Sequence, residues 1–177
     1  MSAIVLTWNP QRWSFAEGER AEQQVRTESG RLTPKAWSIG RRRSVPAGQR
    51  AFLLRQGDGP RGIVASGWTR DLVERTTAAG PSADKTLYVQ VDWDFVVNEA
   101  DPLPVALLAE RALGVNWNSI RQSGVDIPDT AAAVVESLWS AHVRAAAPRH
   151  LRYLSRWRRR GEMRRTGTRA SESTVED

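Results

Sequence analysis

Between Leu87 and Phe95 every second residue is apolar, and this alternation constrains the fold more than any other feature of the sequence. A period of two over this length is typical of a half-buried antiparallel β-strand and excludes a helix, in which apolar residues recur every three or four positions. Asp92 and Asp94 fall on the polar face, which we expect to be solvated; a hard-cation site on this pair is the less favoured interpretation. The chain is therefore predicted to build a sheet around this strand.

Shorter apolar runs elsewhere in the chain have the length of further strands. They are Ile4–Trp8, Ala36–Ile39, Arg50–Gln56 and Gly62–Thr69. The segment Gly57–Arg61 between the last two runs is rich in Gly, Asp and Pro, which is a strong hairpin signal. Residues 70–84, which contain Gly80-Pro81-Ser82, are predicted to form a polar loop.

Three segments carry helical signals. Ser14 and Glu17 have the S-x-x-E spacing of a capping box, which predicts a helix over Phe15–Thr27. A short second helix is predicted over residues 104–112, and an irregular polar loop is predicted over residues 115–127. Pro128 opens a third helix, and one face of it is formed by Ala131, Val134, Val135, Leu138, Trp139 and His142. About five short strands with two or three helices indicate the α+β class, as a small β-barrel with helical cover.

Charge is distributed unevenly along the chain. Residues 1–143 contain 16 Lys and Arg against 16 Asp and Glu, whereas residues 144–169 contain ten Arg against Glu162 alone. We therefore expect one domain at 1–143 and an Arg-rich arm at 144–177. Within the arm, residues 149–160 could form a basic amphipathic helix, and residues 161–177 have too little apolar surface to bury and are expected to be disordered.

Residue content disfavours several classes of chemistry. The chain has no cysteine, which excludes disulfides, thiolate metal sites and a cysteine nucleophile. Its two histidines, His142 and His150, lie at or beyond the end of the expected domain, and no phosphate-loop, nucleophile-elbow or zinc-protease motif occurs. Neither a signal peptide nor a membrane span is indicated, so a cytoplasmic protein is expected. Together these features predict a binding module without catalytic activity, metal or cofactor.

Eight tryptophans against three Phe and two Tyr form an unusual aromatic set. An indole offers a wide flat face, which is the preferred wall for a heterocyclic base. Trp93 and Trp139 fall on predicted core faces. The remaining tryptophans of the expected domain adjoin loops or polar residues and are better candidates for lining a pocket: Trp8, Trp13, Trp37, Trp68 and Trp117.

Several ordered blocks of the sequence resemble the EVE domain of the PUA-like superfamily. They are Thr7–Pro10 with Trp13, Trp37–Arg42, Gly48–Gly57, Pro60–Gly67, and Asn116–Asn118 followed by Arg121, Ser123-Gly124 and Ile127-Pro128. The resemblance covers about residues 3–143 and is closest to the EVE modules that precede HNH nucleases in modification-dependent restriction enzymes. Here the Arg-rich arm stands where the nuclease would follow, so we expect a reader that does not cleave.

This resemblance implies a PUA-like barrel, related to EVE and YTH domains, of about five to six mostly antiparallel strands with two to four flanking helices. It also implies that an extruded modified base enters an aromatic pocket, with modified cytosine in DNA the expected target. Flipping a base costs a few kcal/mol and stacking on one aromatic ring returns about 1–3 kcal/mol, so hydrogen bonds to the base edge are needed as well.

The resemblance assigns roles to individual residues. Trp37 with Ser38 is similar to the cage tryptophan and its polar neighbour, and Asn9 is similar to a base-edge hydrogen-bonding residue. Trp117 with Asn118 is similar to the loop beside the base pocket. The second wall of the aromatic cage, which closes over the base, would be Trp68 or Trp8.

Phosphate contacts are expected from two groups of arginines. The group in the domain is Arg41, Arg42, Arg43 and Arg121, and the group in the arm is Arg152, Arg156, Arg158, Arg159 and Arg160. The implied partner is nucleic acid, DNA rather than RNA, with a separate nuclease as a further candidate. One alternative is that the protein is an RNA-binding or ribosome-associated PUA-like protein. Another is that the arm docks on a protein or an anionic membrane through its apolar residues.

Overall fold

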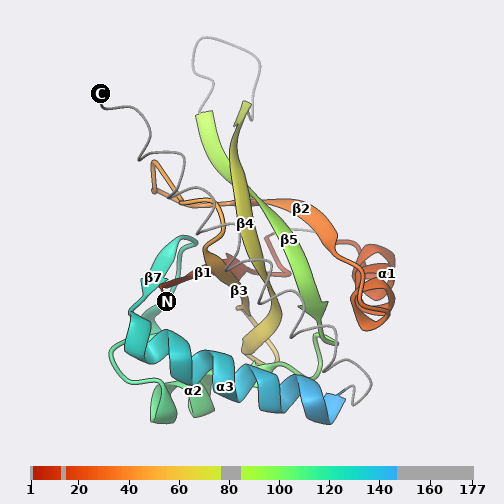
Figure 1. The fold of residues 1–177 in the computed structure, drawn as a ribbon, viewed down its shortest axis with the longest axis vertical. Helices are drawn as coiled ribbons and strands as arrows, with labels where there is room; N and C mark the ends of the chain where they lie inside the picture. The colour runs from red at the N-terminus through yellow and green to blue at the C-terminus, as the bar shows by residue number, and fades with distance from the viewer. Residues whose placement is uncertain (1, 13–14, 77–84, 147–177) are drawn as a thin grey trace, which may run out of the picture.

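The structure is a computed structural model that describes residues 2–12, 15–76 and 85–146 (Figure 1). In chain order the elements are β1 (Ala3–Trp8), α1 (Glu17–Glu28), β2 (Thr33–Ser38), β3 (Arg50–Arg55), β4 (Gly62–Thr76), β5 (Lys85–Val96), β6 (Leu103–Pro104), α2 (Val105–Arg111), the 3-10 helix η1 (Trp117–Ser119), β7 (Val125–Ile127) and α3 (Asp129–Ala146). The predicted α+β class is confirmed.

The strands of the described residues form one seven-stranded sheet. Its order is β2-β5-β4-β3-β1-β7, and β6 pairs with β4 away from this path. Every pairing is antiparallel except that of β1 with β3. In this part of the chain β2 and β7 end the order without pairing to each other, so the sheet is open rather than the closed barrel that we expected.

β4 and β5 form a hairpin that rises well above the rest of the sheet in Figure 1. Residues 70–76 were expected to lie in a polar loop, but they belong to β4, and residues 72–76 pair with β5. Backbone hydrogen bonds between β4 and β5 can hold two strands together without an alternating apolar pattern. The sequence therefore gave no signal for this extension of the hairpin. The register shifts between Thr69 and Leu72, so the pairing crosses an irregularity there.

A second irregularity in β5 changes the faces predicted from the alternation. Ser66 pairs with Phe95 and Gly67 with Trp93, which leaves Asp94 as an extra residue, the arrangement of a β-bulge. Trp93 contacts Trp37 on one face, whereas the Phe95 ring packs 6.4 Å from Trp139 of α3. The alternation therefore predicts the strand correctly but not the face of Phe95.

α1 begins later than the capping box predicted. Its N-cap is Ala16, which makes no side-chain capping bond, and Ser14 lies outside the described residues. Phe15, expected in the first helical turn, precedes the helix and is buried in the core. The expected loop at 115–127 contains η1 and β7, because Val125–Ile127 pairs with β1.

α3 crosses the lower part of the sheet in Figure 1, while α1 packs beside β5. As predicted, α3 follows Pro128 and buries Ala131, Val135 and Trp139. It also buries Glu136, which the sequence pattern did not indicate. Because α3 continues to Ala146, the expected domain end at residue 143 falls inside this helix.

None of the helices in the described ranges combines the length and the apolar character needed to span a membrane.

Candidate functional site

Two of the predicted base-binding tryptophans, Trp8 and Trp37, meet in one aromatic cluster. The Phe15 ring lies edge-on to both, 5.6 Å from Trp8 and 5.7 Å from Trp37, and Trp37 is also edge-on to Trp93 at 6.2 Å. Trp37 Nε1 donates a hydrogen bond to the Thr7 carbonyl at 2.9 Å. Since Trp37 is only 9% exposed, a base can stack on its face only if neighbouring side chains move.

Trp68 and Trp117 lie apart from this cluster. Trp68 pairs with Asp92, so it is on the opposite face of the sheet from Trp93, with the Arg50 guanidinium 5.0 Å from its ring centre. Trp117 is 1% exposed, and its Nε1 donates to the Ala112 carbonyl at 2.9 Å. Trp68 is only 8% exposed, so neither residue presents the open face that we expected of a pocket wall.

The polar residues assigned to the base edge are engaged in local turns. Asn9 is half-buried, and its Oδ1 accepts a hydrogen bond from the Gln11 backbone at 3.0 Å. Ser38 Oγ accepts from the Gly40 backbone N–H at 3.2 Å. Asn118 is exposed in η1. Their roles in base recognition remain predictions.

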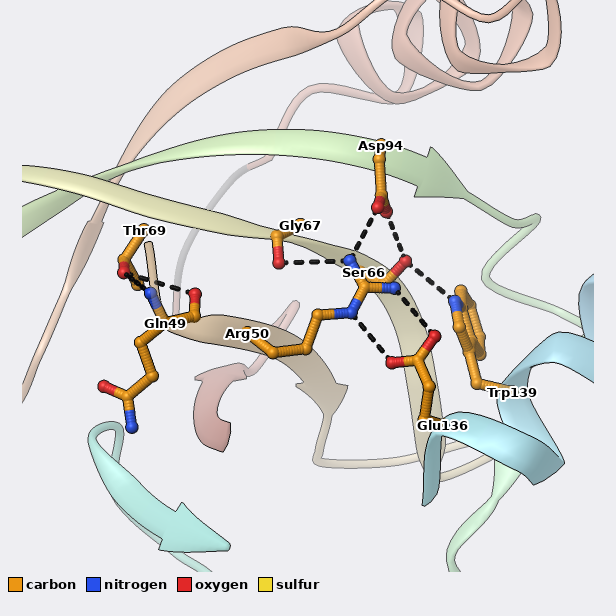
Figure 2. Close-up of polar contacts among 8 residues, drawn as sticks. All are labelled: Gln49, Arg50, Ser66, Gly67, Thr69, Asp94, Glu136 and Trp139. Carbon is orange, nitrogen blue, oxygen red and sulfur yellow. Dashed lines mark hydrogen bonds and ion pairs between the residues drawn. The ribbon is translucent and has the colours of Figure 1, made fainter. Parts of the chain in front are cut away.

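Arg50 holds two carboxylates inside the core, between the sheet and α3 (Figure 2). Its Nη1 lies 2.6 Å from Asp94 Oδ2, and its Nε lies 2.9 Å from Glu136 Oε2. Burial lowers the pKa of the Arg50 guanidinium, but the two neighbouring carboxylates raise it more, so the pKa lies above its ordinary value. The guanidinium is therefore charged throughout the pH range in which proteins are handled.

Ser66 extends this network to a helix tryptophan. Its Oγ donates to Asp94 Oδ1 at 2.6 Å and accepts from Trp139 Nε1 at 2.7 Å (Figure 2). Ser66 and Arg50 are both buried, so this serine is no accessible nucleophile, and the network ties β3, β4 and β5 to α3.

The expectation that Asp92 and Asp94 lie on a solvated face is wrong, since both are buried. The face that carries them is covered, and each carboxylate lies near an arginine: Asp94 near Arg50, and Asp92 within 3.5 Å of Arg70. Across the described ranges no group of three or more acidic or histidine side chains could hold a metal ion. The sequence did contain a signal for the buried ion pair between Arg50 and Glu136. Each of these residues lies on an otherwise apolar face of its strand or helix, and their charges are opposite.

Two turns distant in the sequence pack together to form what we call the turn junction, residues 39–43 with residues 121–126. A Cβ atom at Gly40, whose φ is +63°, would lie 2.5 Å from the Ser123 carbonyl oxygen. A Cβ atom at Gly124, whose φ is +86°, would lie 2.3 Å from the Ile39 carbonyl oxygen. Only glycine fits at either position, because both the backbone conformation and the close approach exclude a side chain.

The turn junction gathers the four arginines of the domain that were predicted to contact phosphate. Arg41 and Arg43 are exposed, and within the described ranges neither has a carboxylate partner. Arg121 is exposed too, and its Nη1 donates to the carbonyls of Asn118 at 2.7 Å and Ile120 at 3.2 Å. These bonds orient the guanidinium and use only part of its five N–H groups.

Arg42 does not fit the predicted role. Its Nη1 lies 2.5 Å from Asp126 Oδ1, and its Nε donates to the Ser44 carbonyl at 3.2 Å. This ion pair spans the turn junction and neutralises Asp126, so we assign Arg42 to holding the two turns together. The predicted ligands Arg152, Arg156, Arg158, Arg159 and Arg160, like Trp13, lie outside the described residues.

Loop 114–128 surrounds an open groove of about 420 Å³ beside the turn junction. Its apolar lining comes from Val115, Ile120, Val125 and Pro128, and its polar lining includes Asn116, Gln122, Arg121 and Asp126. A second cavity, of about 10 Å³, lies between Trp8, Phe15 and Gln23. It has room for a single water molecule and not for a base.

No protein-family model matches this chain, and a search of the curated proteins also found no match.

Proposed function

We propose that this chain is a nucleic-acid-binding module that contacts phosphates through Arg41, Arg43 and Arg121. The observation that supports the proposal most directly is the turn junction, which packs the turn that carries Arg41 and Arg43 against the segment that carries Arg121, about 80 residues away in sequence. Each guanidinium carries a permanent charge and a planar set of donors suited to phosphate oxygens.

Local clustering matters because residues 1–143 have no net charge, with 16 basic and 16 acidic residues. Attraction to a polyanion must then come from the places where positive charge is left unpaired. Three phosphate contacts at the turn junction would contribute about −3 to the slope of log K against log salt. The arginines of the arm would add a larger, sequence-independent term.

A finer part of the proposal concerns the base. We infer from the EVE resemblance that the module reads a modified base, modified cytosine in DNA, by extrusion from the duplex and without cleavage. Trp37 is the residue that this resemblance assigns to stacking. Access to it requires displacement of the Phe15 edge contact, so base binding is expected to be coupled to movement of the segment that carries Phe15. On the same basis we propose that the open seven-stranded sheet is of the PUA-like type.

Charge reversal at the turn junction tests the main proposal. The variant Arg41→Glu/Arg121→Glu is compared with Arg26→Glu/Arg31→Glu, which makes the same change in net charge at the end of α1. Binding of labelled modified duplex, unmodified duplex and RNA is measured by fluorescence anisotropy across a salt series. We expect the junction variant to lose at least tenfold in affinity at about 100 mM salt and about two units of salt slope.

The control variant should retain most of its affinity. Equal losses in the two variants would mean that only net charge matters, which would contradict a phosphate site at the turn junction. Stronger binding of RNA than of either duplex would favour an RNA-binding protein over a DNA reader.

A further inference from the structure

We propose that the groove of loop 114–128 receives one unstacked nucleotide of a bound strand, with the base against the apolar lining and a phosphate on Arg121. This inference rests on the proposed function, since it names the part of the nucleic acid that the site would take. The volume of about 420 Å³ is within the range of small-molecule pockets, about 300–1,000 Å³.

The groove has the mixed chemistry that a nucleotide needs. Val115, Ile120 and Val125 provide an apolar lining for the faces of a base. Asn116 and Gln122 are both exposed at the groove, and a carboxamide presents a donor and an acceptor side by side, the pattern that pairs with a base edge.

The charge of the groove favours an anionic ligand. Two charged residues line it, Arg121 and Asp126, and Asp126 is neutralised by Arg42. The positive charge of Arg121 is therefore left for the ligand. Arg41 and Arg43 are also exposed, and they belong to the turn that packs against residues 121–126. A strand whose base enters the groove can place its neighbouring phosphates on these arginines.

The loop is held in place before any ligand binds. The Trp117 indole N–H bonds to the Ala112 carbonyl, and Gln56 Nε2 donates to the Ile120 carbonyl at 2.6 Å. Ser123 Oγ accepts from the Thr7 backbone at 3.0 Å, and the Gly124 backbone N–H donates to Val5 at 2.9 Å. A preformed site avoids the entropy cost of ordering a loop on binding.

A duplex does not suit this groove, because stacking hides the faces of its bases. Single-stranded and duplex binding should therefore respond differently to changes in the groove. The test variant is Asn116→Ala/Gln122→Ala in the full chain, which removes two exposed carboxamides. The matched control is Gln24→Ala/Asn98→Ala, which removes two carboxamides away from the groove.

Anisotropy is measured with a labelled single-stranded 12-mer and with the duplex of the same sequence. We expect the groove variant to bind the single strand about tenfold more weakly and the duplex within twofold of the unmodified chain, with the control unchanged for both. In parallel, the side-chain amide NMR signals of Asn116 and Gln122 should shift when a nucleoside 5′-monophosphate is added.

Other outcomes separate the two proposals. Unchanged single-strand affinity in the groove variant, with amide signals that do not move, would overturn the groove assignment and leave the phosphate site intact. Amide shifts with an unstructured peptide but not with the nucleotide would overturn it in favour of a protein ligand. Absence of any nucleic-acid binding by the unmodified chain would overturn the proposed function itself.

Discussion

At the scale of the residue, buried charge sets the positions of the strands relative to α3. Arg50, which is only 1% exposed, reaches Asp94 on β5 and Glu136 on α3. Removal of one partner from a buried ion pair is far more damaging than replacement of the whole group, because it leaves uncompensated charge in the core.

The variant Arg50→Met should therefore lower the free energy of unfolding by about 3–5 kcal/mol, as measured by urea denaturation. Arg41→Met, which removes an exposed arginine, should change it by less than about 0.5 kcal/mol. The folded-state pKa of Arg50 is raised, so its contribution is fully present below the ordinary pKa of arginine and is lost only above it. The same loss is thus expected at pH 7 and pH 9, and a strong difference between the two would contradict this explanation.

Two buried tryptophans allow a matched test of base reading. Trp37 and Trp117 each donate an indole hydrogen bond of 2.9 Å to a backbone carbonyl, so replacement of either by Phe should destabilise the fold by about 1–3 kcal/mol. Only Trp37→Phe should reduce the preference for modified over unmodified duplex, because stacking on the base is assigned to Trp37, whereas the Trp117 ring is 1% exposed in the core. Competition binding at a temperature where both variants are folded measures this, and an equal effect of the two substitutions would remove Trp37 from the recognition site.

The sequence predicted which arginines contact phosphate, but not how these arginines are paired. The phosphate contacts of Arg41, Arg43 and Arg121 stay a prediction. The pairing of Arg42 with Asp126 could not be predicted, since these residues are 84 apart in sequence. Phe15 was missed because a single aromatic residue just before a helix does not show whether it belongs to the helix or to the core.

At the scale of the element, close backbone approach decides which glycines are required. A Cβ atom at Gly62 of β4 would lie 2.1 Å from the Leu103 carbonyl oxygen, where β4 pairs with β6. In contrast, nothing lies within 4 Å of a Cβ atom at Gly18 in α1. Only the strand glycine is therefore fixed by its surroundings.

Substitution by alanine should have opposite effects at these two positions. Gly18→Ala should raise the free energy of unfolding by about 0.5–1 kcal/mol, because alanine loses less conformational freedom on forming a helix. Gly62→Ala should lower it by at least about 1 kcal/mol, since the strand pair must separate. Thermal unfolding of the two variants beside the unmodified chain gives the answer, and a stable Gly62→Ala variant would show that the β4–β6 pairing is dispensable.

The strand and helix positions were largely predictable from periodicity, and the bulge at Asp94 was not. A bulge depends on how β5 pairs with β4, and the alternation within β5 is uninterrupted. Because of the bulge, the side chains of Asp94 and Phe95 both lie on the face of the sheet that α3 covers.

At the scale of the whole molecule, charge is divided between residues 1–143, which have no net charge, and the strongly basic residues 144–169. Residues 144–169 contain ten arginines and one acidic residue, so they should provide most of the non-specific affinity for any nucleic acid. The preference for modified over unmodified duplex is expected from the Trp37 site, which lies within residues 1–143.

Replacement of the five arm arginines Arg152, Arg156, Arg158, Arg159 and Arg160 by Gln should reduce the slope of log K against log salt by about 4–5. The ratio of affinities for modified and unmodified duplex should stay the same. A salt titration with both duplexes measures slope and ratio together. If the ratio fell with the slope, the arm would take part in selection and the proposed division of roles would be incorrect.

The class of the fold, the main strands, the helix after Pro128 and the uneven distribution of charge could all be derived from the sequence alone. These properties depend on periodicity, turn residues and charge, all of which are local. Three further features became known from the folded structure: the sheet is open, Asp94 is buried against Arg50, and residues 39–43 pack against residues 121–126. Each of these depends on strand register and on contacts between distant segments, which a local pattern does not encode.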